Sequence, residues 1–210
     1  MSKIILLLKS MHNYSSTSLK DRYLSTKDKI RPLFSKCVNI GCGDHVKRGW
    51  LNLDIAPFNS SVQKFDVTDK ADLDWLSSQK FDYIECMHII GYLNLPQMLA
   101  FFKSCFSALD CGGKLVLEFP DIKKVSYKIV DSEFDQASDD EYLEVIRSLY
   151  AYSIEEAQDI TFRGQTYISG WTASFIALKL RSLGFSDVDV LAPLTHEKRL
   201  WRDSRVEAIK

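Results

Sequence analysis

The distribution of apolar and polar residues predicts strands and helices that alternate from residue 36 onward. Short, mostly apolar runs are typical of strands that are buried on both faces of a parallel sheet. Such runs predict strands at residues 36–40, 50–55, 62–67, 81–87 and 114–119. The Cys-Gly-Gly sequence at 111–113 predicts a turn just before the last of them.

Helical periodicity separates these strands. Residues 70–78 form one helical stretch, and the clearest helical signal lies between 95 and 109, where apolar residues form a single stripe. Asn94 is placed to cap this helix, and Pro96 falls in its first turn, where a missing N–H costs little. Thr172 is likewise placed to cap a further helix, which Gly184 ends.

Residues 121–168 interrupt the alternation. They are polar and acidic at first and then amphipathic, with Tyr142, Val145, Ile146 and Leu149 on one helical face. We interpret the segment as a helical insertion that closes over a site. A helical pair packed on the edge of the sheet is the alternative, and the sequence leaves both open.

The remaining residues complete the predicted fold. Residues 185–191 alternate between apolar and polar positions, as a strand does, and residues 199–209 are their expected antiparallel partner. The order of elements predicts an α/β protein with a doubly wound, mostly parallel sheet over residues 36–210. Residues 1–35 are polar after the first few positions and predict one or two helical turns before this domain.

Composition narrows the class of protein. The chain has 210 residues, enough for one domain with a substantial core, and 46% of them are apolar and 26% charged. A formal net charge of −1 provides no long-range attraction for nucleic acid or an anionic membrane. The apolar run at 4–8 is too short for a secretory signal or a membrane span, so we expect an uncleaved cytoplasmic protein.

Cysteine and histidine usage predicts no metal site. The five cysteines are odd in number and form no C-x-x-C pair, which favours buried free thiols in a reducing compartment. The four histidines are scattered along the chain without the spacing of metal ligands.

Glycines and acidic residues follow the first three predicted strands. Residues 38–44 run from an apolar strand into a Gly-Cys-Gly turn, and glycines let the backbone turn sharply and approach a ligand. Asp54 closes the second strand and Asp66 the third. The carboxyl ends of adjacent parallel strands meet in one crevice. There Asp54 can accept hydrogen bonds from both hydroxyls of a ribose, and Asp66 from the exocyclic amine of a base, with the Val67 N–H nearby. These strand ends together predict a nucleoside site.

In combination the motifs resemble the class I S-adenosylmethionine-dependent methyltransferases. The likeness is most specific where the Gly-Cys-Gly turn is followed by Gly-Trp-Leu-Asn-Leu-Asp at 49–54, an order similar to a bacterial and phage subgroup. The resemblance implies a seven-stranded sheet whose last strand is antiparallel, with S-adenosylmethionine as the cofactor. It covers about residues 36–210 and continues through 66–67, 81–84, 109–121 and 170–185.

Carried over by position, the resemblance assigns one part of the cofactor to each strand end. Gly41 and Gly43 would lie against the methionine part, Asp54 would hold the ribose, and Asp66 the adenine amine. Met87 and His88, at the end of the fourth strand, would face the reacting methyl group. The predicted cofactor-binding residues are Asn39, Gly41, Cys42, Gly43, Asp54, Ile55, Asp66, Val67, Met87 and His88.

The sequence departs from the family pattern in two places. Only six residues separate Gly43 from Trp50, too few for the crossover helix that usually joins parallel strands, so we expect an N-terminal helix to cover the gap. After His88 the chain continues with Ile-Ile-Gly-Tyr, where many relatives carry Glu-His. The second departure removes a polar pair from the predicted site.

Two residues are candidates for catalysis. His88 is the first candidate for a general base, because it is expected beside the methyl group; the alternative is a packed, hydrogen-bonded histidine. Asp121, at the end of the fifth strand, is the second, and its alternative role is to cap the segment that follows. Four residues of the later chain would line the acceptor pocket: Arg163, Gln165, Tyr167 and Trp171.

We therefore predict an S-adenosylmethionine-dependent methyltransferase that acts on a small molecule, with neither nucleic acid nor a membrane as partner. The subgroup resemblance implies a sugar or surface-glycan precursor as the acceptor. One alternative is a module that binds the cofactor without turnover. The other is an NAD(P)-dependent oxidoreductase, which is disfavoured because Val46 stands at the last position of the expected G-x-G-x-x-G.

Overall fold

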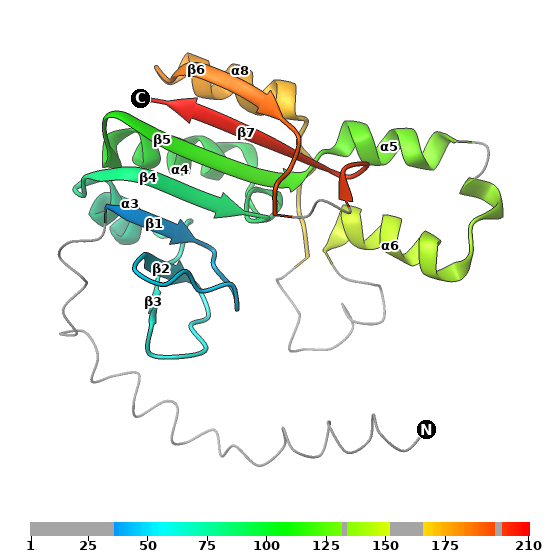
Figure 1. Ribbon diagram of the computed structural model, residues 1–210, viewed down its shortest axis with the longest axis horizontal. Coiled ribbons are helices and arrows are strands. Elements are labelled where there is room, and N and C mark those ends of the chain that lie inside the picture. Colours follow the sequence, from blue (N-terminus) through cyan, green and yellow to red (C-terminus); the bar gives the residue numbers. More distant parts are fainter. Residues whose placement is uncertain (1–35, 132–133, 152–165, 196–198) are drawn as a thin grey trace, which may run out of the picture. The chain divides into compact units, whose positions relative to one another are not determined.

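The structure is a computed structural model that describes residues 36–131, 134–151, 166–195 and 199–210. Its centre is a seven-stranded sheet with the order β3-β2-β1-β4-β5-β7-β6 (Figure 1). The strands are β1 (Cys37–Ile40), β2 (Leu51–Asp54), β3 (Val62–Lys64), β4 (Phe81–Met87), β5 (Leu109–Pro120), β6 (Ser186–Leu191) and β7 (Asp203–Ile209).

The sheet is mixed. β1 to β5 run parallel to one another, whereas β7 is antiparallel to both β5 and β6. The prediction of an α/β sheet with an antiparallel last strand is therefore confirmed. The helices are α3 (Lys70–Ser77), α4 (Leu95–Ala108), α5 (Ile122–Val130), α6 (Asp139–Tyr150) and α8 (Ala173–Ser182), with 3-10 turns η1 (Ile90–Tyr92) and η2 (Phe134–Gln136).

Side-chain caps set the starts of the helices, as the sequence predicts. Asn94 accepts a hydrogen bond from the Gln97 N–H, and the Gln97 side chain returns one to the Asn94 N–H, which completes a capping box at the start of α4. Thr172 caps α8 in the same way, by accepting from the Phe175 N–H.

The predicted turn at 111–113 is wrong. These residues belong to β5, whose pairing with β4 is irregular between Phe81 and Tyr83. Gly112 has a φ of +78°, which supplies the left-handed conformation that this irregularity needs. β5 is therefore an irregular strand that begins before the glycines, and the glycines lie where its pairing is distorted.

One face of the sheet carries the apolar core. Alternate strand residues, such as Ile40, Ile84 and Leu117, are fully buried against α3, α4 and α8. Figure 1 shows α3 and α4 behind the strands. The helical stripe predicted for 95–109 supplies Met98, Phe102 and other residues with no exposed surface. Burial of such side chains stabilises the fold by about 1.5–3 kcal/mol each.

Two further helices, α5 and α6, lie beyond the carboxyl ends of β4 and β5 (Figure 1). They share a small apolar cluster of Val125, Phe134 and Val145. The predicted segment at 1–35 lies outside the described residues, as does the stretch 152–165. No helix in the described part of the chain is long and apolar enough to cross a bilayer.

Buried amides hold the short connection between β1 and β2. The Asn52 side chain accepts from the Lys47 N–H at 2.9 Å and donates to the Lys47 carbonyl at 2.9 Å and the Trp50 carbonyl at 3.0 Å. The Asn39 amide nitrogen donates to the His45 carbonyl at 2.9 Å and to Asn52 at 3.3 Å. These bonds satisfy backbone groups that a crossover helix would otherwise satisfy within itself. The N-terminal helix expected over this gap lies outside the described residues.

We expect Asn52→Ala to lower the free energy of unfolding by about 2–3 kcal/mol, because it leaves several backbone groups of the connection without partners in a buried place. Urea denaturation followed by circular dichroism measures this. The matched control is Asn59→Ala, whose side chain is exposed and serves a surface turn, and which should cost less than about 1 kcal/mol. Equal losses in the two variants would contradict the role assigned to Asn52.

Candidate functional site

The carboxyl ends of β1, β2 and β4 lie side by side. Ile40 pairs with Leu53 of β2 and with Cys86 of β4, so the register sets Gly41 between Asp54 and Met87. Loops and strand ends at this edge of a parallel sheet form the crevice in which α/β proteins bind ligands. The structure thus brings together three of the predicted strand ends.

The two glycines after β1 serve different purposes. Gly41 has a φ of +70°, and a Cβ there would stand 2.1 Å from Cγ2 of Ile89, so no larger residue fits. Gly43 has a φ of +49°, and a Cβ there would have no atom within 4 Å. Gly41 is therefore required by close packing, whereas Gly43 faces open space into which a ligand can approach the backbone.

Asp54 fixes the loops on both sides of this opening. Its Oδ2 accepts from the Gly43 N–H at 2.8 Å, and its Oδ1 accepts from the Ala56 N–H at 2.9 Å. A carboxylate offers about four lone-pair sites, so each oxygen can accept a further hydrogen bond from a ligand. Ile55, the next residue, leaves 59% of its surface exposed beside this carboxylate.

Asp66 lies just beyond β3, and its side chain stabilises the turn that follows. Its Oδ1 accepts from the Thr68 N–H at 2.8 Å and from the Thr68 hydroxyl at 2.7 Å. The neighbouring Val67 packs partly buried against the core. The adenine contact assigned to Asp66 and Val67 stays a prediction, and the Oδ1 contacts show a local role for this carboxylate as well.

Asn39 and Cys42 direct their side chains into the protein. Asn39 is 2% exposed and belongs to the amide cluster that holds the β1–β2 connection. Cys42 is 3% exposed, and burial, together with the charges of Asp54 and Asp44, raises the pKa of its thiol to about 11. Their predicted part in cofactor binding therefore falls to the backbone.

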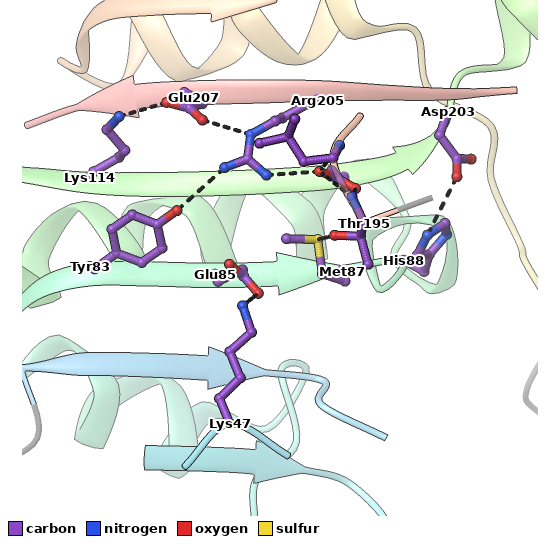
Figure 2. A network of polar contacts seen from close by, with 12 residues as sticks. Lys47, Tyr83, Glu85, Met87, His88, Lys114, Thr195, Asp203, Arg205 and Glu207 are labelled. Carbon is purple, nitrogen blue, oxygen red and sulfur yellow. Dashed lines mark hydrogen bonds and ion pairs between the residues drawn. The ribbon is translucent and has the colours of Figure 1, made fainter. Parts of the chain in front are cut away.

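Met87 and His88 end β4 at the same edge. The His88 N–H donates to the Glu118 carbonyl of β5 at 2.8 Å, and its Nε2 lies 3.7 Å from Oδ2 of Asp203 (Figure 2). The Met87 sulfur accepts a long contact of 3.8 Å from the Thr195 hydroxyl. His88 has 22% of its side chain exposed, so the ring is accessible while one edge faces β7.

Asp121 is buried, and both oxygens of its carboxylate accept hydrogen bonds within the protein. Its Oδ1 accepts from the Lys123 N–H at 3.0 Å, which caps α5. Its Oδ2 accepts from the Ala173 N–H at 3.1 Å and the Ser204 hydroxyl at 3.0 Å. These contacts favour the capping role for Asp121, and its part in catalysis stays a prediction.

The face of the sheet opposite the apolar core carries a network of charged groups (Figure 2). Arg205 of β7 donates to Glu118 at 2.8 Å, to Glu207 at 2.6 Å and to the Tyr83 hydroxyl at 3.4 Å. Burial opposes the charge of Glu118, but hydrogen bonds from the Leu194 N–H and the Arg205 guanidinium outweigh it and lower the pKa of this carboxyl. The network ties the loop after β6 to β5.

Sequence reasoning did not identify this network or Asp203. The strand predicted at 199–209 contains three charged residues, Arg202, Asp203 and Arg205. Charged side chains are rarely buried unless they are paired, so their presence in a central strand was the available signal. The antiparallel pairing of Pro120 with Asp203 brings them to the carboxyl end of β5.

The segment 166–171 lies against η1 next to this edge. The Trp171 indole donates to the Ile90 carbonyl at 2.8 Å, and the Ser169 hydroxyl donates to the Leu93 carbonyl at 2.6 Å. Tyr167 lies across Gly91, where a Cβ would stand 2.6 Å from its ring. Together with Phe119 and Leu149, these aromatic residues line a shallow apolar pocket. Of the predicted acceptor residues, Tyr167 and Trp171 line it, while Arg163 and Gln165 lie outside the described residues.

A comparison with solved structures finds similar proteins among methyltransferases. A SAM-dependent methyltransferase from Archaeoglobus fulgidus is similar over 98% of this chain and 99% of its own, with a TM-score of 0.51 and 13% identity. One from Mesorhizobium loti is similar over 83% of this chain and 90% of its own, with a TM-score of 0.48 and 14% identity. An O-methyltransferase family protein from Burkholderia thailandensis has a TM-score of 0.48 and 10% identity, and the match spans 83% of this chain but only 50% of that protein.

The likeness to the Archaeoglobus structure shows a class I methyltransferase fold for this chain. At these identities the likeness extends to the fold and not to the reaction. No protein-family model and no curated protein matches the sequence.

The two glycines give a matched pair of substitutions. We expect Gly41→Ala to destabilise the domain by about 2–4 kcal/mol, because backbone strain adds to a collision with Ile89. Gly43→Ala meets no neighbouring atom and should cost only about 1 kcal/mol of backbone strain. Thermal unfolding of both variants beside the parent protein measures the difference, and a larger loss for Gly43→Ala would contradict the assignment.

Proposed function

We propose that the protein transfers a methyl group from S-adenosylmethionine to a small-molecule acceptor. The observation that carries the proposal is the contact of the Gly43 N–H with Asp54 at the carboxyl edge of a sheet with the methyltransferase fold. This contact leaves a glycine backbone facing open space next to a carboxylate with free lone pairs. Both features suit a nucleoside with an attached amino acid.

The residues present fit this cofactor. Gly43 faces open space that can take its methionine part, the neighbouring Gly41 keeps the backbone close to Ile89, and Asp54 can accept from both ribose hydroxyls. Ile55 offers an exposed apolar side chain for the face of the adenine, and Asp66 is the candidate for its amine. When bound, S-adenosylmethionine supplies an activated methyl group on a positively charged sulfur. The chain then has chiefly to align the acceptor, and alignment can lower a barrier by roughly 7–11 kcal/mol.

We assign the general base to His88. An acceptor oxygen or nitrogen must lose a proton as it gains the methyl group, and a positioned imidazole contributes typically about 10²–10⁴-fold to such a step. His88 is partly exposed at the end of β4, whereas Asp121 already accepts three hydrogen bonds. That difference favours His88 over Asp121.

The acceptor is proposed to bind beside η1, between the strand ends and the segment after β5. Tyr167 and Trp171 offer flat apolar surfaces against which a ring can pack. In this proposal α5 and α6 form the outer wall of the acceptor site. A sugar or surface-glycan precursor is the acceptor class that we test first.

The cofactor is tested by calorimetric titration of S-adenosylmethionine into the full chain. We expect binding by the parent protein and a loss of about 10- to 100-fold in affinity for Asp54→Ala, which removes hydrogen bonds to a charged group. The matched control is Asp82→Ala, an exposed aspartate near the opposite end of β4, which should bind like the parent. NAD is titrated in parallel. Binding of NAD in place of S-adenosylmethionine would overturn the proposal in favour of an oxidoreductase.

His88 is tested by turnover. We expect His88→Asn to slow methyl transfer to a panel of sugar and other hydroxyl acceptors by at least about 100-fold, a larger effect than any loss of S-adenosylmethionine affinity. Asparagine is chosen because it tolerates the left-handed backbone that His88 adopts. Formation of S-adenosylhomocysteine is the readout, and His45→Asn, at a side chain that is 81% exposed, is the control. Unchanged turnover in His88→Asn would remove His88 as the base, and cofactor binding without turnover in the parent would favour a binding module.

A further inference from the structure

The backbone of His88 is held in an unusual conformation. Its φ is +59°, in the left-handed region that costs a residue with a Cβ roughly 1–2 kcal/mol. Neighbouring elements hold it there: the His88 N–H donates to the Glu118 carbonyl at 2.8 Å, and its carbonyl accepts from the Tyr167 hydroxyl at 3.5 Å. Strain of this kind persists only where the surroundings over-determine it, and such residues cluster at functional sites.

This conformation aims the imidazole at β7. Nε2 of His88 lies 3.7 Å from Oδ2 of Asp203, a carboxylate with no exposed surface (Figure 2). The distance is that of an ion pair and is longer than a hydrogen bond. Hydrogen bonds of catalytic groups are often long before substrate binds and shorten in the complex.

Arg202 already occupies both oxygens of Asp203. Its Nε donates to Oδ1 at 2.6 Å and its Nη2 to Oδ2 at 2.7 Å, in a buried, two-pronged ion pair. A buried carboxylate needs such a partner, because an unpaired charge away from water is strongly disfavoured. The side chain of Asp203 is therefore held in place beside the His88 ring.

We propose that Asp203 is a positioning residue for His88 and that Arg202 moderates its charge, an inference that rests on the proposed methyl transfer. Asp203 faces Nε2 and favours the proton on that nitrogen, and in this proposal Nδ1 is the nitrogen that takes the proton of the acceptor. As the acceptor oxygen or nitrogen forms its bond to the methyl carbon, its proton passes to Nδ1. The electron pair of the broken carbon–sulfur bond stays on sulfur. The imidazolium that results lies beside the Asp203 carboxylate, which stabilises it.

Other charged groups near the ends of β5 and β7 have hydrogen-bond partners of their own. On β5 the Glu118 carboxylate accepts from Arg205, and after β5 Asp121 caps α5. Lys124 of α5 donates to the backbone carbonyl of Asp203. Among the described residues, the charged side chains whose removal should act most directly on the ring are therefore Asp203 and Arg202, and they act in opposite directions.

The test is an NMR titration of the His88 ring in the full chain, with its signal identified by its loss in His88→Asn. Asp203→Asn removes a negative charge beside the ring and should lower the titration midpoint by about 1 pH unit. Arg202→Gln removes the positive charge paired with Asp203 and should raise the midpoint. If Asp203 and Arg202 only stabilise the fold, both variants should move the midpoint in the same direction, toward that of a histidine in an unfolded chain. Such a result would overturn the proposal.

A second measurement needs no variant and so does not depend on the folding of Asp203→Asn. Nitrogen chemical shifts of the neutral ring in the parent protein report which nitrogen carries the proton, and the proposal requires Nε2. A proton on Nδ1 would overturn it.

The pH profile of turnover should follow the NMR midpoints, downward in Asp203→Asn and upward in Arg202→Gln, with S-adenosylmethionine affinity unchanged in both. If the parent protein fails to bind S-adenosylmethionine, the proposed function fails. The NMR titration still decides whether Asp203 and Arg202 control the ring.

Discussion

The buried amide of Asn52 is the contact on which the carboxyl edge of the sheet depends. Parallel strands normally need a helix between them, which satisfies the backbone of the connection and fixes the separation of the strands. Here the connection contains no helix, and Asn52 bonds to Lys47 and Trp50 within it. The contacts of Asn52 order the second half of this connection, while the Gly43 N–H at its start is held by Asp54.

The two faces of the sheet are buried by different kinds of side chain. The apolar face packs against α3, α4 and α8 and supplies most of the buried area. The opposite face buries charges instead, with Arg205 between Glu118 and Glu207. Such a network adds little net stability, because desolvation offsets the attraction between the charges. Its geometric effect is clear: it holds β7 in register with β5, and that register brings Asp203 to the end of β4.

The sequence predicts much of the framework from local signals. Apolar runs locate the strands, and short polar side chains such as Asn94 and Thr172 mark helix starts, because these features depend on neighbours within a turn. Strand ends such as Asp54 are also predictable, since parallel topology brings them to one edge. The contacts of Asp121 with Ala173 and Ser204, and of Asp203 with His88, are not, because each depends on a segment distant in sequence. The irregular course of β5 through Gly112 likewise depends on its pairing with β4.

The position of β7 has a consequence for how the protein folds. β7 follows β6 in the chain, yet in the sheet it lies between β5 and β6. Until β7 is inserted, β5 presents an open edge with unpaired backbone groups, and such an edge readily pairs with the wrong strand. Pairings between distant segments form slowly. The folding intermediate most exposed to aggregation should therefore be the one in which β1 to β5 have assembled and β7 has not yet docked. The ion pair between Arg205 and Glu118 would then act as a check on register, since a shifted strand would leave both charges buried without partners.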